Sequence, residues 1–402
     1  MNSELARRIV FTLGALLVYR FGTYIPLPGV HRPPEQFAHV HVYAGAQFSI
    51  FSLQILPYLT AAILIQLVSM VSSRLGALPR GGEAGRRKLA RYTIGLAVLL
   101  TAFQAYGVAS GLQTIPGFVS EPGGLFLLSA TVTLTGGTVF LIWLSEQITA
   151  HGIGNGLALI LFANLATSMP RAITSAVEST WQGEMSIGRV SLLAILWVAL
   201  VGGVVFVERA RRRVPVEFAA RNLGDRALPA QSTHLSLKLN AAGLMPTVVS
   251  SWLYLLPLMF ASLVFGPNSP WLVAAYQQIG PGHLGHMILS SVAIILLAFV
   301  YTSFVVDPEY AADSLKRHGG VIPGVEPGEP TAAHLDRIVS YATCIGAVYL
   351  AAVFLLPELL LSYSQAPFYL GGASVLVVVC TVLDIETQVR GLTLTRPGGD
   401  YS

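Results

Sequence analysis

A chain of 402 residues is long enough for two or three soluble domains, but its composition excludes that class of protein. Hydrophobic residues make up 53% of the chain and charged residues 11%, whereas soluble domains carry about 25% charged residues. The mean hydropathy of +0.65 and the net charge of +4 are typical of a basic membrane protein.

Ten apolar segments are long enough to cross the membrane, because roughly 20 helical residues span about 30 Å of hydrocarbon. They lie near residues 9–25, 49–72, 93–112, 123–146, 155–171, 189–207, 241–264, 286–306, 337–357 and 368–384. The first is followed by Pro26-Leu27-Pro28-Gly29 rather than by a small-residue cleavage site, so we expect it to remain as an anchor. The connections are short, and the sequence predicts an all-α polytopic membrane protein without a sizeable soluble domain.

The basic residues lie mainly on one side of these segments. Cytoplasmic loops of membrane proteins carry an excess of lysine and arginine. Of the 24 basic residues, all but Arg20, Arg32, Arg171 and Arg189 fall on the side that also holds both chain ends. We therefore expect both termini in the cytoplasm.

We expect the chain to divide into two halves of five segments each. Residues 1–172 hold segments 1–5, and residues 173–240 hold an outer loop, segment 6 and a basic cytoplasmic loop. Residues 241–402 hold segments 7–10 and a short tail. Because each half has an odd number of segments, the halves are inserted with opposite orientations, as in an inverted repeat.

Proline and glycine interrupt the segments at matching places in the two halves. The second segment of each half contains a proline, Pro57 or Pro246, and the fifth segment begins after glycines at 152–156 or 371–372. Interrupted helices at corresponding positions of inverted halves indicate a pathway between them. The alternative is that proline and glycine are simply frequent in membrane helices.

The segments lack the polar chemistry of an enzyme or of an ion-coupled transporter. They contain no Asp dyad, no His-Glu-x-x-His and no Gly-x-Ser-x-Gly. Carboxylates near the middle of the membrane would mark such a transporter, and here Glu146, Glu208 and Asp384 stand at segment ends. Cys344 and Cys380 lack metal-ligand spacing and are interpreted as small buried side chains. We therefore expect an apolar pathway.

Aliphatic residues occupy equivalent offsets in the two halves. Leu59 and Val248 each lie two positions after the proline of their half, and Leu161 and Val377 each lie five positions after its last glycine. In the first half, Ile55 and Leu165 lie one helical turn from Leu59 and Leu161. A ring of such side chains excludes water and ions by dewetting and can still part for a polypeptide. Ordinary helix packing is the alternative. The six residues of this predicted aliphatic ring are Ile55, Leu59, Leu161, Leu165, Val248 and Val377.

Short motifs also follow one another along nearly the whole chain. They are Tyr19-Arg20-Phe21-Gly22, Ile25-Pro26-Leu27-Pro28-Gly29, Ser49-Ile50-Phe51-Ser52-Leu53, Ile55-Leu56-Pro57-Tyr58, Gly82-Glu83-Ala84-Gly85-Arg86-Arg87-Lys88, Glu146-Gln147-Ile148-Thr149, Gly152-Ile153-Gly154-Asn155-Gly156, Val207-Glu208-Arg209, Gln231-Ser232-Thr233-His234, Pro327-Gly328-Glu329 and Pro367-Phe368-Tyr369. In this order they resemble the SecY family, the channel subunits of the bacterial Sec protein translocase.

The resemblance implies a clam-shell of ten helices, in two inverted pseudo-symmetric halves, around a central hourglass pore. Unfolded secretory preproteins would cross the bacterial plasma (inner) membrane through that pore, and the family's pore ring falls on the six aliphatic residues. The family's lateral gate, through which apolar segments enter the lipid bilayer, falls on Thr60 and Leu256. The resemblance implies no cofactor, no metal and no enzymatic activity, since a partner motor ATPase or the ribosome supplies the energy.

Partners are implied in the same way: SecE-like and SecG-like membrane subunits, a SecA-like motor ATPase and the ribosome. Basic loops would attract such partners, above all polyanionic rRNA, through charge steering. The alternative is that these basic residues only set the topology. The residues assigned to docking are Arg86, Arg87, Lys88, Arg209, Arg211, Arg212, Arg213, Arg226 and Glu326.

Three features depart from the family's pattern. Residues 31–48 are shorter than the plug insert of relatives, so we expect a reduced plug and an aliphatic ring that is the main seal. Within that segment, His39 and His41 are interpreted as part of a solvated loop rather than as a metal site. Glu326 stands where relatives carry an arginine that matters for the motor, and His151 stands where relatives tend to carry arginine.

Three functional hypotheses remain at this point. The first is a protein-conducting channel that works with a motor and the ribosome. The second is a specialised or divergent SecY paralogue with restricted clients. The third is an inverted-repeat transporter of small solutes, which charges near the middle of the membrane would favour.

Overall fold

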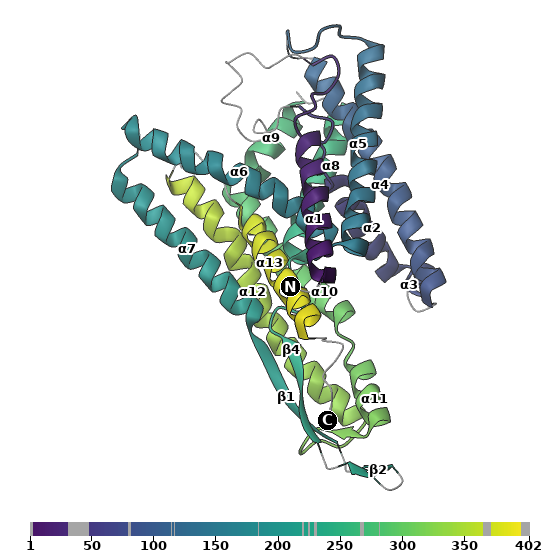
Figure 1. Ribbon diagram of the computed structural model, residues 1–402. Helices are drawn as coiled ribbons and strands as arrows, with labels where there is room; N and C mark the ends of the chain where they lie inside the picture. Colours follow the sequence, from purple (N-terminus) through teal and green to yellow (C-terminus); the bar gives the residue numbers. More distant parts are fainter. Residues whose placement is uncertain are drawn as a thin grey trace. The chain divides into compact units, whose positions relative to one another are not determined.

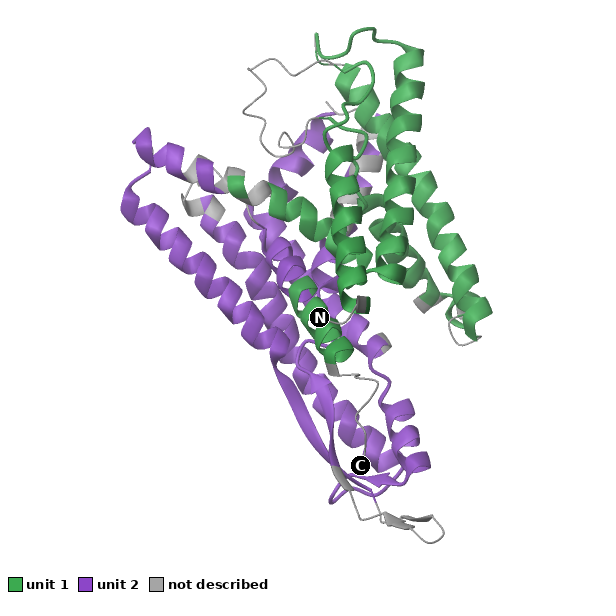
Figure 2. Ribbon diagram, viewed as in Figure 1, with its two compact units in different colours: residues 1–171, 381–402 green, residues 172–380 purple. Residues whose placement is uncertain are grey.

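A computed structural model describes residues 3–30, 48–78, 82–113, 115, 117–183, 185–218, 221–223, 226–228, 231–265, 269–280, 282–364 and 371–394 (Figure 1). Most of them are helical. The chain forms two compact units, one of residues 1–171 and 381–402 and the other of residues 172–380 (Figure 2). The expected limits of the halves stay a prediction.

The first unit is a helical bundle in which α4 packs against both α2 and α5, and α1 packs against α5. One of its apolar cores gathers Tyr19, Phe51, Ile55, Leu141 and Ile160. Every one of these side chains is at most 5% exposed, so this core is closely packed. Its elements are α1 (Ser3–Gly22), α2 (Leu56–Val71), α3 (Ser73–Gly76), α4 (Gly82–Gln113), α5 (Gly124–His151), the start of α6 (Gly156–Trp181) and the end of α13 (Gly372–Leu394).

The second unit combines membrane helices with a small sheet. Helix α10 packs against α8 and α12, and α11 packs against the start of α12. Its helices are the end of α6, α7 (Ile187–Arg209), α8 (Met245–Phe265), α9 (Pro270–Ile279), α10 (Leu284–Val305), α11 (Pro308–His318), α12 (Glu329–Ser364) and the start of α13.

The sheet lies in the basic segment between α7 and α8 and was not predicted. Strands β1 (Arg211–Phe218) and β4 (Gln231–Lys238) pair antiparallel, and β5 (Gly320–Val321) pairs with the other edge of β1. Between them, β2 (Arg221–Leu223) and β3 (Arg226–Leu228) form a second small hairpin. The expectation of a purely α-helical chain was therefore incomplete.

Alternation along the strands explains why this sheet forms. Val214 and Val216 are buried, whereas Arg213, Pro215 and Glu217 are exposed, which is the two-residue period of a strand with one buried face. The buried face packs on α11, on the segment after it and on the first turns of α12, with Ile322 and Leu335 in the shared core. The two-residue period is visible in the sequence of residues 213–217, next to the basic residues of the same segment.

Each of the ten predicted segments coincides with a helix, which confirms the helical membrane-protein fold. Six helical segments among the described residues are long and apolar enough to cross a membrane, and residues 56–69 and 156–167 form shorter apolar helices. The second predicted segment was too long at its start. Residues 49–55 form turns, because Gln54 has a left-handed φ of 54° and Pro57 stands in the first turn of α2. The count of ten crossings stays a prediction.

Candidate pore, gate and docking residues

The start of α2 carries three predicted site residues. Ile55 immediately precedes the helix and is fully buried in the core of the first unit, and Leu59, one turn on, is 4% exposed. Thr60 is also buried, and its hydroxyl donates to the Leu56 carbonyl at 3.0 Å. The predicted gate residue Thr60 therefore satisfies its polar group within its own helix and presents a methyl group to its surroundings.

The start of α6 is fixed by a threonine from the preceding helix. The Thr149 hydroxyl donates to the Ser145 carbonyl at 2.9 Å and accepts from the Gly156 N–H at 2.9 Å. Asn155 caps the helix, since its Oδ1 accepts from the Leu157 N–H at 3.0 Å. The backbone groups that a helix start leaves unpaired are thus bound by side chains.

The glycine-rich turn before α6 is tied to two further helices of the same unit. The Ile153 N–H donates to Thr12 Oγ1 in α1 at 2.9 Å, and the Gly154 N–H donates to Gln388 Oε1 in α13 at 2.8 Å. Gly154 has φ +83°, a conformation that favours glycine. This turn holds α6 and hence the predicted ring residues Leu161 and Leu165, both half-buried.

The second unit carries the remaining ring and gate residues. Val248 is half-buried in the first turn of α8, two residues after Pro246. Val377 is 6% exposed in α13. Leu256 lies in α8 directly before Pro257, where the helix loses one backbone hydrogen bond.

The structure brings some predicted ring residues together. In the first unit, Leu161 packs against the core cluster that contains Ile55. Leu59 and Leu165 follow these two residues by one turn along α2 and by one turn along α6. A ring of all six residues, and a gate that involves Thr60 and Leu256, stay predictions.

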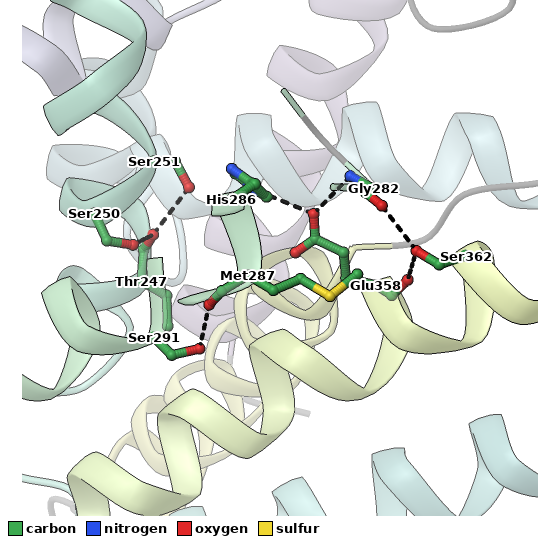
Figure 3. A network of polar contacts seen from close by, with 9 residues as sticks. All are labelled: Thr247, Ser250, Ser251, Gly282, His286, Met287, Ser291, Glu358 and Ser362. Atoms are coloured by element: carbon green, nitrogen blue, oxygen red, sulfur yellow. Dashed lines mark hydrogen bonds and ion pairs between the residues drawn. The ribbon is translucent and has the colours of Figure 1, made fainter. Parts of the chain in front are cut away.

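A buried carboxylate in α12, Glu358, was not among the acidic residues that the sequence analysis named. Glu358 is 1% exposed, and its Oε1 lies 3.1 Å from His286 Nε2 and accepts from the Gly282 N–H at 3.0 Å (Figure 3). Among the described residues, no hydrogen-bond partner reaches Glu358 Oε2. The predicted segment ended near residue 357, just before Glu358, whereas α12 continues to Ser364.

Both backbone groups of Gly282 are held by one face of α12. Glu358 binds its N–H, and Ser362, one turn further on, donates its hydroxyl to the Gly282 carbonyl at 3.1 Å (Figure 3). Gly282 has φ +86° and leads into α10. Glu358 lies six residues from the end of α12, or about 9 Å along the helix axis. The network therefore reads as a clasp between α10 and α12, not as an ion pathway.

The first group of predicted docking residues is exposed at the start of α4. Arg86, Arg87 and Lys88 are all solvent-accessible. Arg87 and Lys88, together with Glu83, Ala84 and Arg91, line a pocket of about 400 Å³. Arg87 pairs with Glu83 at 3.3 Å, but both side chains are exposed, so the pair contributes little to stability.

The second group lies on the hairpin of β1 and β4, here called the docking hairpin (residues 211–218 and 231–238). Arg211 faces Lys238 and Arg213 faces Ser236 across the strands, while His234 faces Pro215. These residues are exposed, so one face of the hairpin is basic. Arg212 is exposed on the opposite face and Arg209 is exposed at the end of α7; Arg226 belongs to β3.

Glu326 is exposed in the loop before α12. Its carbonyl accepts from the Thr331 hydroxyl at 2.7 Å, which fixes the loop while leaving the carboxylate in solvent. His151 is exposed at the end of α5, with its ring centroid 5.6 Å from that of Phe11.

Several sequence-based predictions lie outside the described residues. They concern the plug segment at residues 31–47, which includes His39 and His41, and the Pro367-Phe368-Tyr369 motif. Within the part of the chain that the structure describes, no group of three or more His, Cys, Asp or Glu side chains could hold a metal ion.

Comparisons with known proteins relate the chain to protein translocation channels. The family model SecY matches residues 49–386. The protein translocase subunit SecY of Escherichia coli K12 is 39% identical over 98% of this chain and 92% of its own length, and that of Vibrio cholerae is 39% identical over 96% and 91%.

Solved structures agree on the fold. A structure of a SecY channel with its plug domain has a TM-score of 0.69 at 18% identity and covers 97% of this chain and 93% of its own. A second protein-conducting channel has a TM-score of 0.68 at 18% identity with the same coverage, and Sec61 in a canine ribosome–channel complex has 0.63 at 16%, covering 97% and 93%. The near full-length match at 39% identity decides the relationship: this chain belongs to the SecY family.

Proposed function

We propose that this chain is the channel subunit of a protein translocase and passes unfolded secretory polypeptides across the membrane. The observation that carries the proposal is the 39% identity, over 98% of the chain, to relatives named protein translocase subunit SecY. Structures described as protein-conducting channels share the fold. No observation favours a transporter of small solutes, since the buried Glu358 is bound within a clasp at one end of α10 and α12.

The aliphatic ring would seal the resting pore. Ile55, Leu59, Leu161, Leu165, Val248 and Val377 offer no hydrogen-bonding group to water, so a narrow ring of them would expel water and block ions. A polypeptide could still push the side chains apart, because the contacts are non-directional. Apolar segments of the polypeptide would leave sideways past Thr60 and Leu256.

The energy would come from partners rather than from this chain. Sec61 and yeast Ssh1, which share the fold, were solved with ribosomes, and a ribosome is the partner that the basic docking hairpin suits best. A SecA-like motor would use the same face, with Glu326 as an altered contact. SecE-like and SecG-like subunits would complete the complex in the plasma membrane, with both termini of the chain in the cytoplasm.

Disulfide trapping tests the pathway. The native Cys344 and Cys380 are replaced by alanine, a single cysteine is placed at Leu161 or Val377, and a secretory precursor with one cysteine is arrested during translocation. We expect oxidation to link the precursor to both positions. Val198 on α7 is the control, because its side chain is 74% exposed on a helix outside the predicted ring. Linkage to residue 198 alone would place the polypeptide outside the ring.

Complementation tests the breadth of the function. A bacterium depleted of its own SecY should resume export of ordinary secretory proteins when this chain and its membrane partners are supplied. Export of only a narrow subset would identify a specialised paralogue, which is the outcome that the sign change at Glu326 would explain.

A further inference from the structure

The docking hairpin is joined directly to two membrane helices. Only Ala210 separates the end of α7 from β1, and residues 239–244 connect β4 to the start of α8. The Leu239 N–H donates to the Ala210 carbonyl at 3.1 Å, which continues the strand pairing to the helix ends. A force on the hairpin would therefore reach α7 and α8 without passing through a flexible linker.

One buried amide side chain holds the connection into α8. Asn240 is 4% exposed, its Oδ1 accepts from the Gly243 N–H at 3.1 Å, and its Nδ2 donates to the Gly243 carbonyl at 3.1 Å. Gly243 has φ +64°, and α8 begins two residues later. The amide supplies both the donor and the acceptor that this turn uses, whereas an ionised aspartate has no donor for the Gly243 carbonyl.

A carboxylate at the end of α7 anchors that amide. Glu208 Oε1 accepts from Asn240 Nδ2 at 2.7 Å and from the Tyr349 hydroxyl of α12 at 3.3 Å. Tyr349 lies one turn beyond Gly346, whose missing side chain lets the Leu239–Asn240 backbone lie against α12; an added Cβ would stand 3.1 Å from the Leu239 carbonyl oxygen. The end of α7, the start of α8 and the middle of α12 thus meet at one polar junction.

The first turns of α8 beyond this junction have polar groups that bond only locally. Thr247 donates to the Leu244 carbonyl at 2.6 Å, and Ser250 and Ser251 both donate to the Thr247 carbonyl (Figure 3). Hydroxyls that compete for helix carbonyls bend helices, and Pro257 removes a further backbone bond. These features weaken the backbone bonding of α8 beyond the junction, so a bend is easier there than in a regular helix.

We propose that Asn240 and Glu208 are positioning residues that couple partner docking at the hairpin to the orientation of α8. The proposal rests on the proposed function, because α8 carries Val248 and Leu256, the predicted ring and gate residues. A partner that shifts the hairpin would move the Asn240 turn as one body with Glu208 and so re-aim α8. Without the Asn240 amide, the partner would still bind to the hairpin, but its binding would no longer change the orientation of α8.

The test compares Asn240→Ala, Glu208→Gln and Tyr349→Phe in the full channel complex reconstituted into vesicles with ribosomes carrying a nascent precursor. Three quantities are measured: the ribosome Kd, the rate of precursor translocation, and the thiol reactivity of a single cysteine at Val248 with and without bound ribosomes. Tyr349→Phe is the matched control, because it removes the longest bond of the junction and leaves the bond between Asn240 and Glu208 in place.

For Asn240→Ala we expect an unchanged Kd, a translocation rate lower by about tenfold, which is the scale of one hydrogen bond to a carboxylate, and a thiol reactivity that ribosomes no longer alter. Glu208→Gln should fall between Asn240→Ala and the wild type, because a neutral amide oxygen still accepts from Asn240. If Asn240→Ala does not accumulate in the cell, the same three measurements on Glu208→Gln test the coupling. The wild type tests the proposed function separately, since a complex that moves no precursor would overturn that function rather than the coupling.

Two results would overturn the coupling. In one, ribosomes change the reactivity at residue 248 equally in Asn240→Ala and in the wild type. In the other, the loss of translocation is matched by an equal loss of ribosome affinity, which would make the junction part of the docking surface and not a positioning element.

Discussion

Gly372, the first residue of α13, lies against the backbone carbonyl of Val353 in α12 so closely that a Cβ atom has no room there. Pro357 stands four residues after Val353 and has no N–H, so this carbonyl lacks its usual helical partner. The first unit repeats the contact. Gly156, the first residue of α6, lies equally close to the Ser145 carbonyl of α5. The glycines that fix the sequence offsets of Leu161 and Val377 therefore share a local structural role.

Replacing either glycine by alanine should destabilise the protein. For Gly156→Ala and Gly372→Ala we expect a loss of about 1–3 kcal/mol, because the obstructing atoms are backbone and can move only with a helix. Thermal unfolding of the purified protein in detergent measures the loss. Gly202→Ala is the control, since a Cβ at that position of α7 meets nothing within 4 Å. Equal melting temperatures for all three variants would contradict the close contacts.

The stability of the protein should fall more when the Glu358 side chain is truncated than when it is replaced by a neutral amide. Glu358→Gln keeps an acceptor for the Gly282 N–H, whereas Glu358→Ala removes that acceptor from the half-buried N–H and from the buried His286 ring and should cost about 1–3 kcal/mol. The double variant His286→Leu with Glu358→Leu should recover part of the loss, because it also removes the buried imidazole that the Glu358 carboxylate contacts. A double-mutant cycle on unfolding free energies measures the coupling. Additive losses would show that the two side chains do not interact.

Charge reversal on the docking hairpin should weaken ribosome binding. Arg211 and Arg213 share the exposed basic face, so Arg211→Glu with Arg213→Glu should lower the affinity on the order of tenfold at low salt. The difference should shrink as salt is raised, because exposed charges are screened over about 10 Å at 0.1 M. Co-sedimentation with ribosomes measures it. Arg189→Glu at the start of α7 is the control, and an equal effect there would indicate unspecific attraction.

Removal of the shortened plug segment should not open the channel. If the aliphatic ring is the main seal, deletion of residues 33–46 leaves the resting ion conductance in planar bilayers unchanged. Leu161→Ser, which places a hydroxyl in the predicted ring, should instead raise the conductance. A leak that follows the deletion but not Leu161→Ser would assign the seal to the segment and not to the ring.

The sequence alone determined the helical membrane-protein class and the placement of ten apolar helices. Ten apolar segments coincide with ten helices because burial in lipid demands long apolar runs whose backbone groups bond within one segment. The order of the short motifs identified the resemblance to the SecY family, because those residues are read directly from the chain. The six aliphatic residues could be selected from their offsets to Pro57, Pro246, Gly156 and Gly372 without any coordinates.

Tertiary structure decided what the polar residues do. The bonds from Glu358 to Gly282 and from Asn240 to Glu208 join positions 76 and 32 residues apart, and no local period encodes such distances. The docking hairpin also depends on tertiary structure, although its sequence pattern is local. Its two-residue alternation is local and legible, but only packing on α11 and α12 gives Val214 and Val216 a core to face. Local patterns fix helices and strands, whereas the partners of buried polar groups follow from which elements meet in space.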